Sequence, residues 1–70
     1  MEVAEQLGLN IRVMRVRKQM TQEQLAFNAD MHPTYLSEIE RGKRKISVEM
    51  LIRVAKALDC KAAELIEGLG

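Results

Sequence analysis

The stretch at residues 21–47, TQEQLAFNADMHPTYLSEIERGKRKIS, decides the fold because two helix starts lie close together within it. Thr21 and Gln24 have the spacing of a capping box. In that motif the hydroxyl accepts a hydrogen bond from a free backbone N–H, and the amide side chain reaches back to the cap. We therefore predict a helix from Gln22 to Ala29, with Leu25 and Ala26 on its apolar face.

A second helix is predicted from Pro33 to Arg41. Proline is favoured at the first position of a helix, where its missing N–H costs nothing, and His32 precedes it as the cap. Gly42 falls where a left-handed residue commonly ends a helix. The two predicted helices are joined by a three-residue turn, which is the arrangement of a helix-turn-helix motif.

Three further helices are predicted around this pair. The first runs from about Val3 to Lys18, with cations in its last turn. Its apolar residues at helical spacing are Leu7, Ile11 and Met14. Ser47 is a good cap for the next helix, and a last short helix contains Leu65 and Ile66. The fold class is therefore predicted to be all-α, a compact five-helix domain over residues 1–70 that contains a helix-turn-helix.

The composition narrows the class of protein. A chain of 70 residues can build only one domain, and its net charge of +1 gives no global attraction to a polyanion, so local clusters must supply it. Cys60 cannot form an internal disulfide and is expected to be a small core residue. With a single histidine there is no zinc site, and we expect no metal, cofactor or small-molecule ligand. No apolar run approaches the ~18 residues of a membrane span, so we expect a cytoplasmic protein without a membrane partner.

The helix from Pro33 to Arg41 has an apolar inner face and a polar outer face. The outer residues that we expect to contact base edges are Thr34, Tyr35, Ser37 and Glu38. A cationic loop follows, comprising Arg41, Lys43, Arg44 and Lys45. Such a run can be an ordinary solvated loop, but beside an exposed polar helix it favours contacts with phosphates. This layout fits double-stranded DNA, with the helix in the major groove.

The same residues carry a resemblance to a known family. Ile11-Arg12, the run from Thr21 to Ala26, the run from Tyr35 to Arg44 and Ser47 resemble the phage Cro/repressor-type helix-turn-helix family. They are particularly similar to the small controller proteins of restriction–modification systems. The resemblance covers roughly residues 7–69. It implies a five-helix fold, a homodimer and a pseudo-palindromic DNA operator.

The resemblance also implies roles for single residues. Arg15 and Glu40 match the family's internal salt bridge, and breaking such a pair would leave its buried partner unpaired. Gln22 matches a position that contacts a phosphate, although it could also be an exposed helix former. The full set of residues expected to contact phosphates is Gln22, His32, Arg41, Lys43 and Arg44.

Two further positions are interpreted through the family. Thr34 and Glu38 match positions that point toward the base edges, where Glu38 would accept from a cytosine or adenine amino group. The alternative is that Glu38 only pairs with Arg41 or Lys45 on the surface, a contact worth little. Asp30 stands where the family usually has glycine, and Asp occupies a left-handed turn at some cost.

The sequence therefore predicts a sequence-specific transcriptional regulator rather than an enzyme. There is no nucleophile–base pair, no carboxylate dyad and no Gly-rich phosphate loop. Self-association is expected through the last two helices, by Met50, Ile52, Leu65, Ile66 and Leu69. The rival hypothesis is a helix-turn-helix protein-interaction module, such as an antitoxin or a coactivator, but its outer face would be expected to carry more aromatic or apolar anchors.

Overall fold

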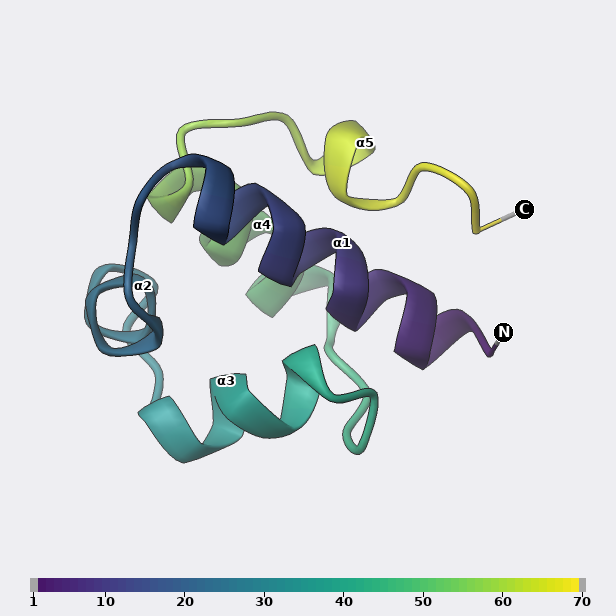
Figure 1. Ribbon diagram of the computed structural model, residues 1–70, viewed down its shortest axis with the longest axis horizontal. Helices are drawn as coiled ribbons and strands as arrows, with labels where there is room; N and C mark the ends of the chain where they lie inside the picture. Colours follow the sequence, from purple (N-terminus) through teal and green to yellow (C-terminus); the bar gives the residue numbers. More distant parts are fainter. Residues whose placement is uncertain (1, 70) are drawn as a thin grey trace.

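The computed structural model describes residues 2–69 and folds them into five helices without a strand (Figure 1). The helices are α1 (Val3–Arg17), α2 (Gln22–Asn28), α3 (Pro33–Glu40), α4 (Val48–Ala57) and α5 (Ala62–Leu65). α1 crosses the molecule and packs on α3 and α5, whereas α4 packs on α2 and α5. The all-α, five-helix prediction is confirmed. None of these helices is long and apolar enough to cross a membrane.

The helix starts follow the predicted caps. The Thr21 hydroxyl accepts from the Gln24 N–H at 3.0 Å, and the Thr21 N–H donates to the Gln24 side chain at 2.9 Å. His32 Nδ1 accepts from the Thr34 N–H at 3.1 Å, and Ser47 caps α4. Each cap satisfies a backbone donor that the helix itself leaves free, and the His32 cap fixes the point at which the turn between α2 and α3 ends.

Four helices end through a residue with positive φ: Gln19, Asp30, Gly42 and Asp59. At the end of α2, the Met31 N–H donates to Ala26 O at 2.9 Å and the Asp30 N–H donates to Phe27 O at 3.1 Å, the bond pair of a Schellman motif. Only Gly42 adopts this conformation without a side-chain penalty. Asp30 therefore makes the turn expected from the sequence while carrying conformational strain.

The core lies among all five helices, each of which contributes at least one buried apolar side chain. Its largest fully buried side chains are Ile11, Leu25, Leu36, Ile39, Val54, Leu58 and Leu65. The expectation that Leu65 belongs to a self-association surface is wrong, because its side chain is 0% exposed and packs in this chain's own core. A four-residue helix is too short for apolar periodicity to show which side faces inward.

α1 and α3 lie very close together at Gly8, for which the sequence predicted no role. A Cβ added there would lie 2.1 Å from Ile39 O and 2.9 Å from Glu40 O. Gly8 is buried although it lies in the middle of a helix. Its missing side chain therefore lets the backbone of α1 lie against the carboxyl end of α3.

Candidate nucleic-acid interface

α3 presents the polar face that the sequence predicted. Leu36 and Ile39 are completely or almost completely buried, whereas Thr34 is exposed and Ser37 is half-buried. In Figure 1, α3 lies along the lower edge of the molecule, and no other helix of the described residues covers its lower side. A polar helix face that stands clear of its neighbours has the shape required to enter a major groove.

The loop after α3 folds back onto that face through Arg44. Arg44 Nε donates to Glu38 Oε1 at 3.0 Å, and its guanidinium carbon lies 5.2 Å from the centre of the Tyr35 ring. The Tyr35 hydroxyl donates to the Lys45 carbonyl at 3.4 Å. The surface partner of Glu38 is therefore Arg44, and not Arg41 or Lys45, which the alternative interpretation of Glu38 named. Arg44 lies beside the predicted base-reading residues rather than apart from them.

The other expected phosphate ligands are accessible. Arg41, Lys43 and Lys45 are exposed around the end of α3, and Arg41 Nε donates to Ser37 O at 3.4 Å. His32 is exposed at the start of α3 and uses Nδ1 as an acceptor. In the neutral ring this hydrogen bond assigns the proton to Nε2, which leaves a donor on the outer side.

A buried ion pair connects α1 to the end of α3. Arg15 donates to both carboxylate oxygens of Glu40, at 2.7 and 3.1 Å, and also to Met20 O at 2.8 Å. Gln22 Nε2 adds a fourth bond of this network, 3.0 Å from Glu40 Oε1. Only 13% of the Arg15 side chain and 2% of the Glu40 side chain are exposed. Loss of one partner would leave a buried charge, which costs about 3–5 kcal/mol.

This network also fixes the first side chain of α2. Gln22 is half-buried, and one of its two amide N–H groups is held by Glu40. The second N–H and the amide oxygen are not used in that bond. The ion pair and the proposed phosphate ligand are therefore parts of one hydrogen-bonded unit.

The residues expected to mediate self-association do not form one surface. Met50 and Ile52 are two positions apart on α4, so their side chains point to opposite sides of that helix. Ile52 and Ile66 are 43% and 45% exposed, and Leu69 is half-buried. Ile52, Ile66 and Leu69 remain available to a partner.

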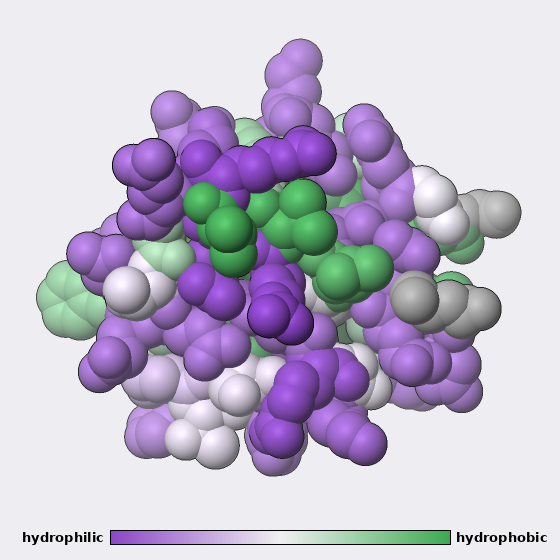
Figure 2. Space-filling view, in the orientation of Figure 1, coloured by the Kyte–Doolittle hydropathy of each residue, from purple (hydrophilic) through white to green (hydrophobic). Residues whose placement is uncertain are grey.

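A further apolar patch lies on α1, and the sequence analysis missed it. Figure 2 shows apolar side chains gathered on the face that α1 crosses, surrounded by hydrophilic ones. The exposed apolar residues of α1 are Val3, Leu9, Val13 and Val16. Leu9, Val13 and Val16 recur at helical spacing, a signal that was present in the sequence but was hidden by the inner stripe of the same helix.

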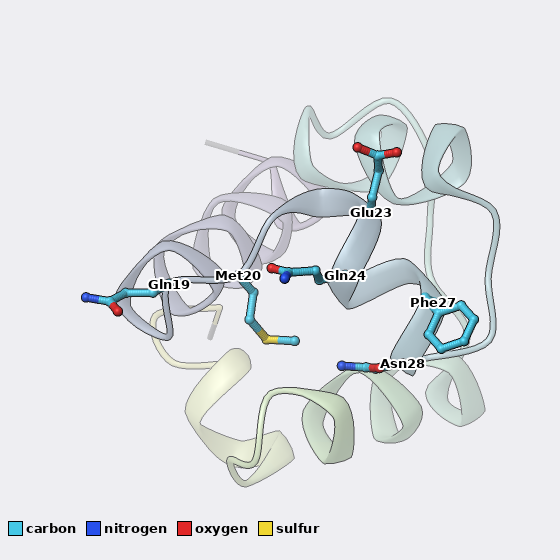
Figure 3. Close-up of a pocket in the computed structure, with 6 residues that line it drawn as sticks. All are labelled: Gln19, Met20, Glu23, Gln24, Phe27 and Asn28. Atoms are coloured by element: carbon cyan, nitrogen blue, oxygen red, sulfur yellow. The ribbon is translucent and has the colours of Figure 1, made fainter.

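A shallow hollow of the surface lies beside α2, away from the polar face of α3 (Figure 3). Met20 and Gln24 lie in its middle, and Gln19 and Phe27 lie at opposite ends. Phe27 is 85% exposed, which makes it the aromatic side chain most open to solvent. The side chains around this hollow are amides, a carboxylate, a thioether and a phenyl ring.

Cys60 packs against the core, as expected. Burial raises the pKa of its thiol, and the nearby Glu64 carboxylate raises it further. A raised pKa keeps the thiol protonated and unreactive at neutral pH. Among residues 2–69, no group of three His, Cys, Asp or Glu side chains is placed to hold a metal ion.

Comparison with known proteins identifies the family of proteins to which this chain is similar. A family model described as helix-turn-helix matches residues 11–65. Control protein C.BamHI from Bacillus amyloliquefaciens is 41% identical over 61 residues, which are 86% of this chain and 75% of that protein.

Solved structures of controller proteins are similar to this chain over most of its length. The restriction-modification controller protein C.AhdI from Aeromonas hydrophila has a TM-score of 0.87 at 34% identity, covering 89% of this chain and 94% of that one. The controller protein C.Esp1396I, crystallised as a tetramer with its natural 35 base-pair operator, has a TM-score of 0.85 at 31% identity, covering 96% and 88%. The chain therefore belongs to the helix-turn-helix family, as a regulator of the restriction–modification controller type.

Proposed function

We propose that the protein is a sequence-specific transcriptional regulator that binds double-stranded DNA as a homodimer on a pseudo-palindromic operator. The observation that carries this proposal is the free polar face of α3 with exposed cations beside its end. The similar C.Esp1396I, solved on its operator, supports DNA as the partner. Such a regulator acts in the cytoplasm, where bacterial DNA lies.

The base contacts are assigned to the outer side of α3. They are Thr34, Tyr35, Ser37 and Glu38. The Thr34 hydroxyl and methyl suit a base edge or a thymine methyl group, and the Glu38 carboxylate accepts from an exocyclic amino group. Because Arg44 is paired with Glu38 and stacked on Tyr35, we place it with the groups that set base preference.

The phosphate contacts are assigned to the rim of this face. They are Gln22, His32, Arg41 and Lys43. Arg41 and Lys43 supply charge at the end of α3, and Gln22 and His32 supply N–H donors at the starts of α2 and α3. Contacts of this kind set the register of the protein on the duplex and make affinity depend on salt.

The homodimer is proposed to form through Ile52, Ile66 and Leu69. One recognition helix reads only a few base pairs, so two copies on half-sites about one helical turn apart are needed for useful specificity. Ile66→Glu should dissociate the dimer in sedimentation at micromolar concentration. Val13→Glu, which places the same charge on the apolar patch of α1, is the matched control and should leave the dimer intact.

Selection of binding sites from a random DNA pool, followed by footprinting, tests the function. We expect an enriched sequence with two related halves whose centres lie about 10 base pairs apart. The rival interpretation, a protein-interaction module, has the exposed Phe27 in its favour. A protein that enriches no sequence would reject DNA readout and favour that module.

A further inference from the structure

α1 connects the recognition helix to the segment that carries the proposed dimer surface. On one side, Gly8 lies against the backbone of Ile39 and Glu40 in α3. On another side, the Asn10 side chain reaches the backbone that ends α5. α1 is therefore the helix that contacts both α3 and α5, and the distance between the DNA-reading face and the segment after α5 depends on these contacts.

The contact at Asn10 involves two carbonyl groups. Asn10 Nδ2 donates to Leu65 O at 2.9 Å and to Glu67 O at 2.8 Å. Ile66 lies between the two residues whose carbonyls are held. The Asn10 side-chain oxygen accepts from Gln6 Nε2 at 2.9 Å, which fixes the orientation of the amide. The amide therefore holds the backbone before and after Ile66, at the Leu65–Ile66 and Glu67–Gly68 peptide groups.

This contact supports a segment whose backbone hydrogen bonds lengthen after the start of α5. α5 has only four residues, and a helix of that length is not stable alone. The Ile66 N–H reaches Ala63 O at 3.3 Å, and the Leu69 N–H reaches Ile66 O at 3.3 Å. Besides the buried Leu65, the two hydrogen bonds of the Asn10 amide attach this turn to α1.

We propose that Asn10 is a positioning residue for dimerisation, and that it fixes the spacing of the two recognition helices by holding the backbone on either side of Ile66 against α1. The inference rests on the proposed homodimer. Two recognition helices accept one half-site spacing only if each reading face is rigidly joined to the dimer surface. Without the two hydrogen bonds of Asn10, the end of the chain would move relative to α1, and other spacings would be tolerated.

The test uses Asn10→Asp, which keeps the size and shape of the side chain but replaces the donor by an acceptor. Its carboxylate would face the two carbonyl oxygens of Leu65 and Glu67 and repel them. Asn28→Asp is the matched control, because it makes the same chemical change at an exposed site on α2. Circular dichroism establishes that each variant is folded before it is compared.

Two measurements are made on each protein. Sedimentation gives the dimer dissociation constant, which we expect to rise about tenfold or more in Asn10→Asp, as the loss of one or two hydrogen bonds predicts. Binding is also measured to the selected operator and to the same operator with one base pair inserted between its halves. An insertion turns the half-sites by about 35° relative to each other, so the wild type should lose at least about tenfold in affinity and the variant only a few-fold.

The ratio of the affinities for the two operators separates a positioning role from an effect on dimer stability alone, because overall affinity cancels in this ratio. Asn10→Asp with a wild-type ratio would overturn the inference, even if its dimer were weaker. If Asn10→Asp does not fold, Gln6→Ala replaces it, since it removes only the bond that orients the amide, and it should shift the ratio in the same direction by a smaller amount. A wild-type ratio in Gln6→Ala would then overturn the inference. A wild-type protein that is monomeric or selects no operator would instead reject the proposed function.

Discussion

Substitution of Gly8 by alanine sets two physical effects against each other. Alanine is the better helix former, and in the middle of a helix it gains about 1 kcal/mol over glycine. The new methyl carbon, however, would lie 2.1 Å from Ile39 O. The closest ordinary approach of carbon to a carbonyl oxygen is about 3.3 Å, so α1 and α3 would have to separate by about 1 Å.

The free-energy cost of separating α1 from α3 should exceed the gain in helix propensity. Overpacking a core costs about 1–3 kcal/mol, and the upper end applies here because the obstructing atoms are backbone and cannot rotate away. Displacement of the end of α3 would also stretch the bonds between Arg15 and the buried Glu40. Subtracting the helix gain leaves a net loss of about 2 kcal/mol or more. In a domain of this size that lowers Tm by roughly 8–16 °C.

Urea unfolding followed by circular dichroism measures the effect. Val16→Ala is the control, because it also improves helix propensity in α1 but changes a side chain that is 57% exposed. We expect the control to change stability by less than about 0.5 kcal/mol. Gly8→Ala with wild-type or higher stability would refute the reasoning, since helix propensity would then outweigh the close approach.

Further predictions follow from the proposed interface and from the strained turn. Lys43→Ala should weaken binding to all sequences alike and reduce the salt slope in log K by about 0.9, as measured by titration at several salt concentrations; a change in base preference would contradict its role as a phosphate ligand. Glu38→Gln should relax selectivity at one base pair per half-site by about 1–3 kcal/mol and raise affinity for random DNA; an unchanged consensus in binding-site selection would make Glu38 a bystander. Arg44→Ala should alter preference at the base pair that Glu38 reads, because it frees that carboxylate. Asp30→Gly should stabilise the fold by less than about 1 kcal/mol, because Asp30 has φ +56°, and a lower urea midpoint would show that its side chain stabilises the turn.

The sequence predicted what depends on local chemistry. Thr21 with Gln24, His32 with Pro33, and Ser47 identify helix starts because a cap acts within three residues of itself. The polar face of α3 and the cations after it were also predictable, since helical spacing alone places them. The partner of Glu38 could not be predicted, because it depends on how the loop after α3 folds back onto the helix.

Features that depend on packing between distant segments could not be predicted. Nothing in the local sequence around Gly8 shows that α3 will lie against it. Asn10 is an ordinary polar residue of a helix until α5 brings two carbonyls next to it. Leu65 was assigned to the wrong surface because four helical residues show no periodicity.

Because the net charge is low, the specificity of DNA binding depends on the contacts that hold α3 and the proposed dimer surface on α1. With 11 cationic and 10 acidic side chains, the protein has little general attraction to DNA, so its binding depends on the few cations around α3. In the proposed interface those cations contact phosphates and do not read sequence, so discrimination between operators depends on how accurately α3 presents its side chains to the bases. Gly8 and Arg15 fix α3 on α1, and the proposed role of Asn10 fixes the dimer surface on the same helix. A loss of rigidity in α1 contacts should therefore reduce specificity more than it reduces binding to random DNA.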